Sequence, residues 1–190
     1  TDIEDLRRLL LSIDGDGWIN LRDRLIICLL FWCGLRVGSL VALRIDDVDL
    51  RNSLLRVRRA KGGDPQMVPL LPVVKMAFAE YIYQRPAVRT DALFPAASGF
   101  QSPQDVGVQD SGVRLMLKRR CKVAGIEAKN PHSLRHGLAM HLLNHLGADM
   151  SFISEILGHK DEKTTEKYYA HWKTDGLAKK YAKLIEDNGN

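Results

Sequence analysis

The segment from His132 to His136 carries three side chains that could together hold a phosphate group. Residues three and four positions apart share one face of a helix, so His132, Arg135 and His136 are expected to point in roughly the same direction. A guanidinium group offers a planar fork of donors to two phosphate oxygens, and an imidazole can move a proton near neutral pH. A basic helix surface without chemistry has the same composition, so this segment alone does not decide between the two interpretations.

Four further features of the sequence could act on an anion. Arg36 follows directly on a long apolar segment, where an arginine is poorly placed unless it meets an anion or a carboxylate. Lys61 lies in a Lys-Gly-Gly turn, from which its side chain can reach outward. His159 follows a Leu-Gly pair, and Tyr168 and Tyr169 form a tyrosine pair about ten residues later. Each feature taken alone has an ordinary structural explanation.

The spacing of the histidines also permits a metal site. His132 and His136 are four residues apart, as are His141 and His145, and two histidines one helical turn apart can chelate zinc. No glutamate follows the first histidine of either pair, and no acidic or cysteine residue stands nearby as a third ligand. We therefore expect no metal site.

These residues must be positioned by a mostly helical chain. Apolar spacing, capping residues and Gly or Pro stops predict the helices. Short β-branched segments separated by turn residues predict three strands, and the Pro-, Gly- and Ser-containing stretch Arg85–Asp110 is expected to be mostly loop. The expected fold class is α+β, mainly α-helical with a small three-stranded antiparallel sheet. The expected helices are one that starts at Thr1, those over 21–33, 39–43, 72–84, 111–124, 130–147 and 151–158, one that begins at Asp161 and contains the tyrosine pair, and a tail helix through 177–185; the expected strands are Val48–Leu50, Leu54–Arg59 and Gln66–Leu70.

The bulk composition is that of one globular domain. With 190 residues, 45% of them hydrophobic and 27% charged, the chain can bury a core of its own. The longest apolar run, Leu25–Cys33, has nine residues, whereas a membrane span needs about 20. No secretion signal precedes it, and Cys28, Cys33 and Cys121 are expected to be reduced core residues, with a Cys28–Cys33 disulfide as the less favoured alternative. These features predict a cytoplasmic protein without a membrane partner.

Basic residues gather in two stretches of the chain. The formal net charge is +5 and the isoelectric point is about 9.2. Residues 51–61 hold five Lys or Arg and no acid, and residues 113–136 hold seven Lys or Arg and one acid, Glu127. Basic patches of this kind suit a polyanion such as DNA. The side chains we expect to contact DNA are Arg58, Arg59, Lys118, Arg119, Arg120 and His136.

Taken in order, the motifs resemble the tyrosine recombinase (phage integrase) family. The resemblance rests on Gly-Leu-Arg36, the Lys61 turn, His132-x-x-Arg135, Leu-Gly-His159 and the tyrosine that follows, and it spans Thr1 to about Trp172. It implies that residues 1–172 have the fold of the family's C-terminal catalytic domain. Residues 173–190 would be a tail helix that in relatives docks into a neighbouring protomer. The N-terminal core-binding domain of full-length relatives is expected to be absent from this chain.

The resemblance also implies a role for each matching residue. Arg36 and Arg135 would contact the non-bridging oxygens of the scissile phosphate, and His159 would add a hydrogen bond to it. Lys61 would protonate the leaving 5′ oxygen, and His132 would help to deprotonate the tyrosine. The product would be a 3′-phosphotyrosyl enzyme that conserves the phosphodiester energy, so neither a metal nor a nucleotide cofactor is expected.

Two positions leave alternatives open. Nine residues after His159, the spacing of many family members, stands Tyr168. The string Thr-Thr-Glu-Lys-x-Tyr-Ala instead resembles a subset of integrases whose nucleophile is the second residue of the pair, which is Tyr169 here. We favour Tyr169, with Tyr168 as the alternative. Ser39 stands where relatives usually carry an acidic residue, so Arg36 is expected to be held less firmly.

The function implied is that of a site-specific DNA recombinase, such as the integrase of a phage or other mobile element. Such an enzyme would bind double-stranded DNA in the cytoplasm, at the nucleoid, and would assemble on it as a homo-oligomer, a tetramer. One alternative is a type IB topoisomerase, which shares the chemistry but relaxes supercoils as a monomer; the Leu-Gly-His159 motif argues against it. The other is a catalytically inactive DNA-binding regulator. A reactive residue stands at every expected position, which argues against this alternative.

Overall fold

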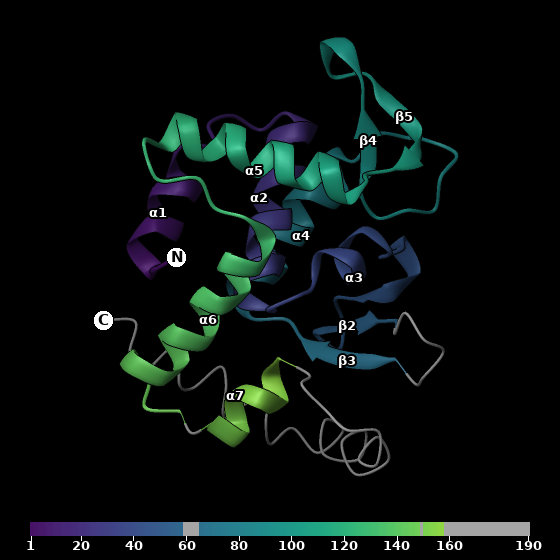
Figure 1. Cartoon of the computed structure of the whole chain (residues 1–190). Helices are drawn as coiled ribbons and strands as arrows, with labels where there is room; N and C mark the ends of the chain where they lie inside the picture. The colour runs from purple at the N-terminus through teal and green to yellow at the C-terminus, as the bar shows by residue number, and fades with distance from the viewer. Residues whose placement is uncertain (59–64, 149, 158–190) are drawn as a thin grey trace.

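The chain folds around α2 (Trp18–Trp32), a helix that is buried on nearly all sides (Figure 1). In this computed structural model, residues 1–58, 65–148 and 150–157 are described. The burial of α2 follows from its composition, because apolar residues occupy every face of the helix. Around it pack α3 (Val37–Val41), α4 (Pro72–Gln84) and α6 (Pro131–His145).

A second pair of helices, α1 (Ile3–Leu11) and α5 (Asp110–Ala124), pack against each other. The sequence predicts both helices, but the predicted first residue of each is wrong. The side chain of Asp2, and not Thr1, caps α1 by accepting the Asp5 N–H at 2.7 Å. α5 begins at Asp110, one residue before the predicted start of this helix at Ser111. Where several capping residues stand together, local sequence does not decide which one caps.

A small antiparallel sheet lies beside this helical core, in the strand order β1-β2-β3. Its strands are β1 (Val48–Asp49), β2 (Leu54–Val57) and β3 (Gln66–Pro69), as the sequence predicts to within two residues. Leu55 pairs with Val68, and both are buried. The sheet therefore turns one face toward the core. The described residues end at residue 58 and resume at residue 65, so Lys61 lies outside them.

The prediction that Arg85–Asp110 is mostly loop is wrong in part. This stretch contains a second, two-stranded antiparallel sheet, β4 (Pro95–Ala97) and β5 (Pro103–Gly107), joined through η2 (Gly99–Gln101). Figure 1 shows this hairpin projecting from the helical body. Each strand begins with a proline, which a strand tolerates at its first residue but which reads in a sequence as a loop signal.

The last two described helices are α6, capped by Asn130 with Pro131 in its first turn as predicted, and α7 (Met150–Ile156). The helix predicted over 151–158 already begins at Met150, so Ser151 lies inside it and not at its start. The helix predicted from Asp161 and the tail helix lie outside the described residues. All three cysteines are buried and free, as expected. No helix among the described residues is long and apolar enough to cross a membrane.

Candidate active site

A glycine turn at the end of α2 sets the position of Arg36. Gly34 adopts a φ of +57°, and a Cβ atom there would lie 2.6 Å from Leu157 Cδ2 and 3.2 Å from Leu138 Cδ2. Glycine is thus required both by the left-handed backbone and by the close approach of α6 and the end of α7. Two residues later the chain enters α3, whose N-cap is Arg36, with an exposed side chain. The motif Gly-Leu-Arg36 thereby brings a solvent-facing guanidinium beside three packed segments.

Arg135 joins the same three segments from the inside. It projects from α6, is only 6% exposed, and donates one hydrogen bond from Nη1 to the carbonyl oxygen of Gly34. Its Nη2 donates a second bond, of 2.7 Å, to the carbonyl oxygen of Leu157. One guanidinium therefore fixes the turn after α2 and the last described residue after α7 relative to α6.

The electrostatics of this pair are unusual within the molecule. Burial lowers the pKa of Arg135 to about 10, and the nearby positive charge of Arg36 is the second cause. Two arginines are buried in the described ranges, Arg22 and Arg135, and Arg22 has the carboxylate partner Asp23. In the part of the chain that the structure describes, neither Arg135 nor Arg36 forms an ion pair with a carboxylate. A bound anion between the two guanidinium groups would offset both the burial and the repulsion.

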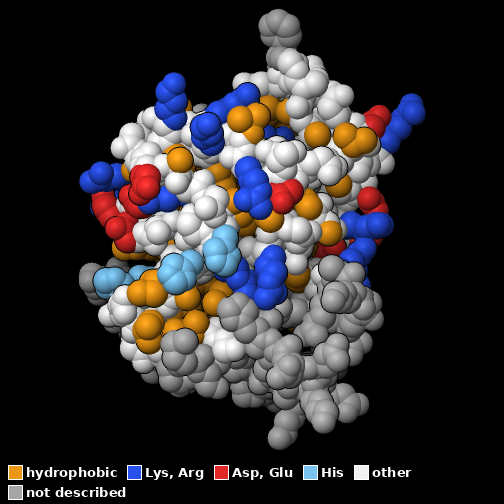
Figure 2. Space-filling model, in the orientation of Figure 1, with side chains coloured by type: hydrophobic (Ala, Val, Ile, Leu, Met, Phe, Trp, Pro, Cys, Tyr) orange, Lys and Arg blue, Asp and Glu red, His pale blue; other side chains and the backbone are white. Residues whose placement is uncertain are grey.

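The histidines of α6 follow the prediction only in part. His132 and His136 are both exposed, whereas Arg135 turns inward toward Gly34 and Leu157, so the predicted single polar face is wrong for Arg135. All four histidines in the described ranges belong to α6, and Figure 2 shows their side chains in a row that ends beside Lys and Arg side chains. Inside this row His141 lies 5.4 Å, between ring centroids, from His145.

The remaining predicted reactive residues lie outside the described residues: Lys61, His159, Tyr168 and Tyr169. No group of three or more His, Cys, Asp or Glu that could hold a metal occurs among the residues the structure describes. Ser39, in place of the usual acid, is half-buried.

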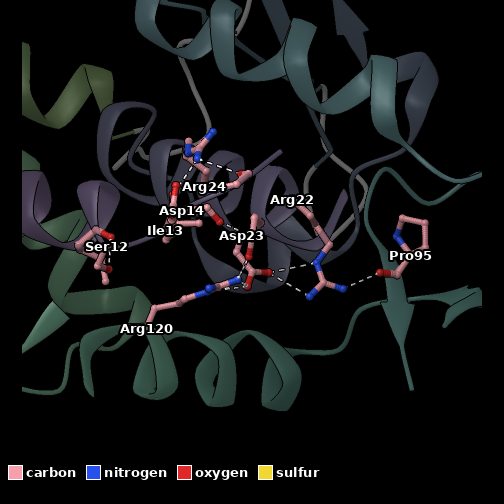
Figure 3. A network of polar contacts seen from close by, with 11 residues as sticks. Ser12, Ile13, Asp14, Arg22, Asp23, Arg24, Pro95 and Arg120 are labelled. Atoms are coloured by element: carbon pink, nitrogen blue, oxygen red, sulfur yellow. Dashed lines mark hydrogen bonds and ion pairs between the residues drawn. The ribbon is translucent and has the colours of Figure 1, made fainter. Parts of the chain in front are cut away.

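Of the residues predicted to contact DNA, three are exposed and free of carboxylates in the described ranges: Lys118 and Arg119 on α5, and His136 on α6. Arg59 lies outside those ranges. Arg120 turns inward, where its Nη2 lies 2.7 Å from the buried carboxylate of Asp23 (Figure 3). Its prediction as a DNA contact remains untested, but the structure gives this side chain another partner.

Arg58 has an acidic partner as well. Its Nη2 lies 3.0 Å from Oδ1 of Asp47, and the same oxygen accepts from Nε of Arg56 at 3.0 Å. Neither Asp23 nor Asp47 was singled out from the sequence, because an acid among many gives no sign of being buried. The nearest signal is the alternation of Arg56 and Arg58 along a strand, which places both on one face.

Most of this chain is similar to known proteins. The sequence profile of the phage integrase family matches residues 2–175. Tyrosine recombinase XerD of Pseudomonas putida is 38% identical over 173 residues, which cover 86% of this chain and 54% of the relative. Tyrosine recombinase XerD of Proteus mirabilis is 39% identical over 169 residues, 85% of this chain and 51% of the relative. The chain thus spans about half the length of the curated relatives that it matches.

Solved structures give the same result. The crystal structure of XerA recombinase superimposes with a TM-score of 0.70 and 30% identity, over 88% of this chain and 59% of that one. The integrase from mycobacterium phage Brujita has the same TM-score, 0.70, at 24% identity, over 98% of this chain and 56% of that one, and so shares its fold.

Proposed function

Because this chain belongs to the phage integrase family, we propose that it is the catalytic part of a site-specific DNA recombinase, such as the integrase of a phage or other mobile element. In this proposal a tyrosine attacks a phosphodiester of double-stranded DNA and a 3′-phosphotyrosyl enzyme forms. Residues 1–172 are then the catalytic domain, and residues 173–190 are a tail that can be exchanged between protomers of a tetramer assembled on DNA, in the cytoplasm and at the nucleoid.

The observation that carries the proposal is the pairing of Arg36 with Arg135. These two guanidinium groups are close enough for the charge of one to lower the pKa of the other, and neither has a carboxylate partner in the described ranges. Arg36 is exposed, so it is open to a ligand that approaches from solvent. A phosphodiester supplies the missing negative charge and two oxygens that match the fork of an arginine.

The reaction follows from what a phosphodiester needs. Its oxygens carry negative charge that must be neutralised while a nucleophile attacks, and its leaving alkoxide must be protonated. The tyrosine oxygen forms a bond to phosphorus as the bond to the 5′ oxygen breaks. The phenolic proton passes toward His132, and Lys61 gives a proton to the 5′ oxygen, so a 5′ hydroxyl is released. Reversal of the same steps rejoins the strand without a nucleotide.

Arginine charge takes the place that a metal ion holds in other phosphoryl-transfer sites, so the proposal includes no metal. Arg36 and Arg135 stay protonated throughout and stabilise the pentacoordinate transition state. Arg135 is also held by Gly34 and Leu157, which keeps its remaining N–H donors in a fixed direction. Preorganised donors of this kind lose little energy to rearrangement during the reaction.

The test is a suicide substrate: a duplex nicked so that the 5′ hydroxyl diffuses away after cleavage and traps the covalent enzyme. The protein should form an adduct, and the adduct should persist in a chelator. Tyr169→Phe should abolish it, whereas the matched variant Tyr168→Phe should retain it. The opposite result would assign the attack to Tyr168. Absence of an adduct, or an adduct that requires added magnesium, would contradict the proposal.

A further inference from the structure

A buried carboxylate holds two arginines together on the outer face of the three-stranded sheet. The side chain of Asp47 is 0% exposed, and its Oδ2 accepts the backbone N–H of Arg44 at 2.9 Å. Its Oδ1 accepts from Arg56, which lies in β2, and from Arg58, which directly follows the last residue of β2. Leu55 and Val57, between and beside them, are buried, so the two arginines project from the opposite face of the strand.

The charges of this cluster do not balance. A buried carboxylate requires a cationic partner, and one guanidinium is enough to neutralise its charge. Asp47 has two such partners, Arg56 and Arg58. Arg56 and Arg58 are 43% and 41% exposed. Asp46 accepts from Arg56 only through its backbone carbonyl, at 3.5 Å. Within the described ranges, no acceptor binds the Nη1 of either arginine. One positive charge and several N–H donors therefore face the solvent in a fixed position.

A second cluster of the same composition shows what a closed arrangement looks like. Asp23 also binds two arginines, Arg22 and Arg120, whose side chains are only 9% and 19% exposed (Figure 3). Their further donors bind the carbonyl oxygen of Pro95, at 3.0 Å, and Oδ1 of Asn20, at 2.7 Å. That cluster fastens α2 to α5 and β4, and it leaves little of either arginine open to solvent. The Asp47 cluster differs in its exposure, because more than 40% of each arginine side chain faces the solvent.

We propose that Arg56 and Arg58, positioned by Asp47, bind a backbone phosphate of DNA, in addition to the phosphate held at Arg36 and Arg135. This inference rests on the proposed function for its partner. A phosphate fits because it supplies the one negative charge that the cluster lacks and accepts from two guanidinium groups at once. Contacts to phosphate fix the position of a duplex without reading its sequence.

The test is the salt dependence of DNA binding, measured with this chain by fluorescence anisotropy between 50 and 300 mM salt. The affinity for DNA falls as salt rises, and loss of one phosphate contact makes the slope of log K against log salt shallower by about 1. Arg56→Ala and Arg58→Ala should each make the slope shallower by this amount, to the same extent on two duplexes of unrelated sequence. Each variant should keep its melting temperature, because Asp47 retains the other arginine as a partner.

The matched control is Arg22→Ala, which removes the more deeply buried arginine of the closed cluster and was not predicted to contact DNA. It should lower the melting temperature and leave the slope unchanged. Asp47→Asn tests whether Asp47 positions the two arginines. Its DNA binding is measured well below the melting temperature of the variant. Simple electrostatics predicts tighter binding when an acid is lost, whereas loss of positioning predicts weaker binding, which is the result we expect.

Two results would overturn the inference while the proposed function stands: DNA binding in which both Arg56→Ala and Arg58→Ala keep the wild-type slope, or tighter binding by Asp47→Asn. If the wild-type chain binds no DNA at any salt concentration, the proposed function fails, and this contact fails with it.

Discussion

Replacement of Gly34 by alanine perturbs the point where α2, α6 and α7 meet. A non-glycine residue in the left-handed region costs about 1–2 kcal/mol. The added methyl group would also lie 2.6 Å from Leu157 Cδ2 and 3.2 Å from Leu138 Cδ2. Both leucines are buried, so their side chains must repack, at a further cost of about 1 kcal/mol, the low end for overpacking. The total is about 2–3 kcal/mol, a loss of roughly 4–12 °C in melting temperature for a chain of this size.

Two other glycines separate these causes. Gly125 has a φ of +66° but nothing within 4 Å of a built Cβ, so Gly125→Ala should show the backbone strain alone. Gly38 lies in α3 with neither a positive φ nor a close neighbour, so Gly38→Ala should be neutral or slightly stabilising. Thermal unfolding followed by circular dichroism gives the three melting temperatures, expected in the order Gly38→Ala, Gly125→Ala, Gly34→Ala from highest to lowest.

Gly34→Ala should also reduce activity, and by more than the loss of folded protein explains. The carbonyl oxygen of Gly34 accepts from Arg135, so a shifted turn moves Arg135 and Arg36 relative to each other. Adduct formation on the suicide substrate, measured at a temperature where the variant is folded, should therefore fall, whereas Gly125→Ala should react at the wild-type rate. A Gly34→Ala variant as stable and as active as Gly38→Ala would refute this reasoning.

Two further predictions concern the core. Asp23→Asn leaves two arginines without their buried partner and should cost about 3–5 kcal/mol, whereas Asp91→Asn, at an exposed ion pair, should cost at most about 1 kcal/mol; chemical denaturation measures both, and equal effects would contradict the assigned burial. Burial, with the charge of His145 as a smaller cause, lowers the pKa of His141 from 6.5. The unfolded chain therefore binds this proton first, and stability should decrease as the pH falls below about 6.5. His141→Asn should weaken that decrease, and the exposed-site variant His136→Asn should not.

Local signals were sufficient for most of the elements that position the site. The Pro72–Gln84 helix has its predicted bounds, and Asn130 with Pro131 starts α6, because caps, stops and apolar spacing act within a few residues of one another. The β4–β5 hairpin escaped prediction because each of its strands begins with a proline and β5 carries polar, mostly exposed side chains. Such strands are defined by their partner across the hairpin, and not by their own alternation.

For the site, the sequence by itself determined which residue types stand in which order, and so indicated Arg36, His132 and Arg135 as one family pattern. Only the tertiary structure decided which side chains remain open to a ligand. Arg119 and Arg120 are neighbours in one basic run, yet Arg120 pairs with Asp23, 97 residues away. The physical reason is that a charge is occupied or free according to what packs against it. Those partners come from distant segments that no local pattern brings together.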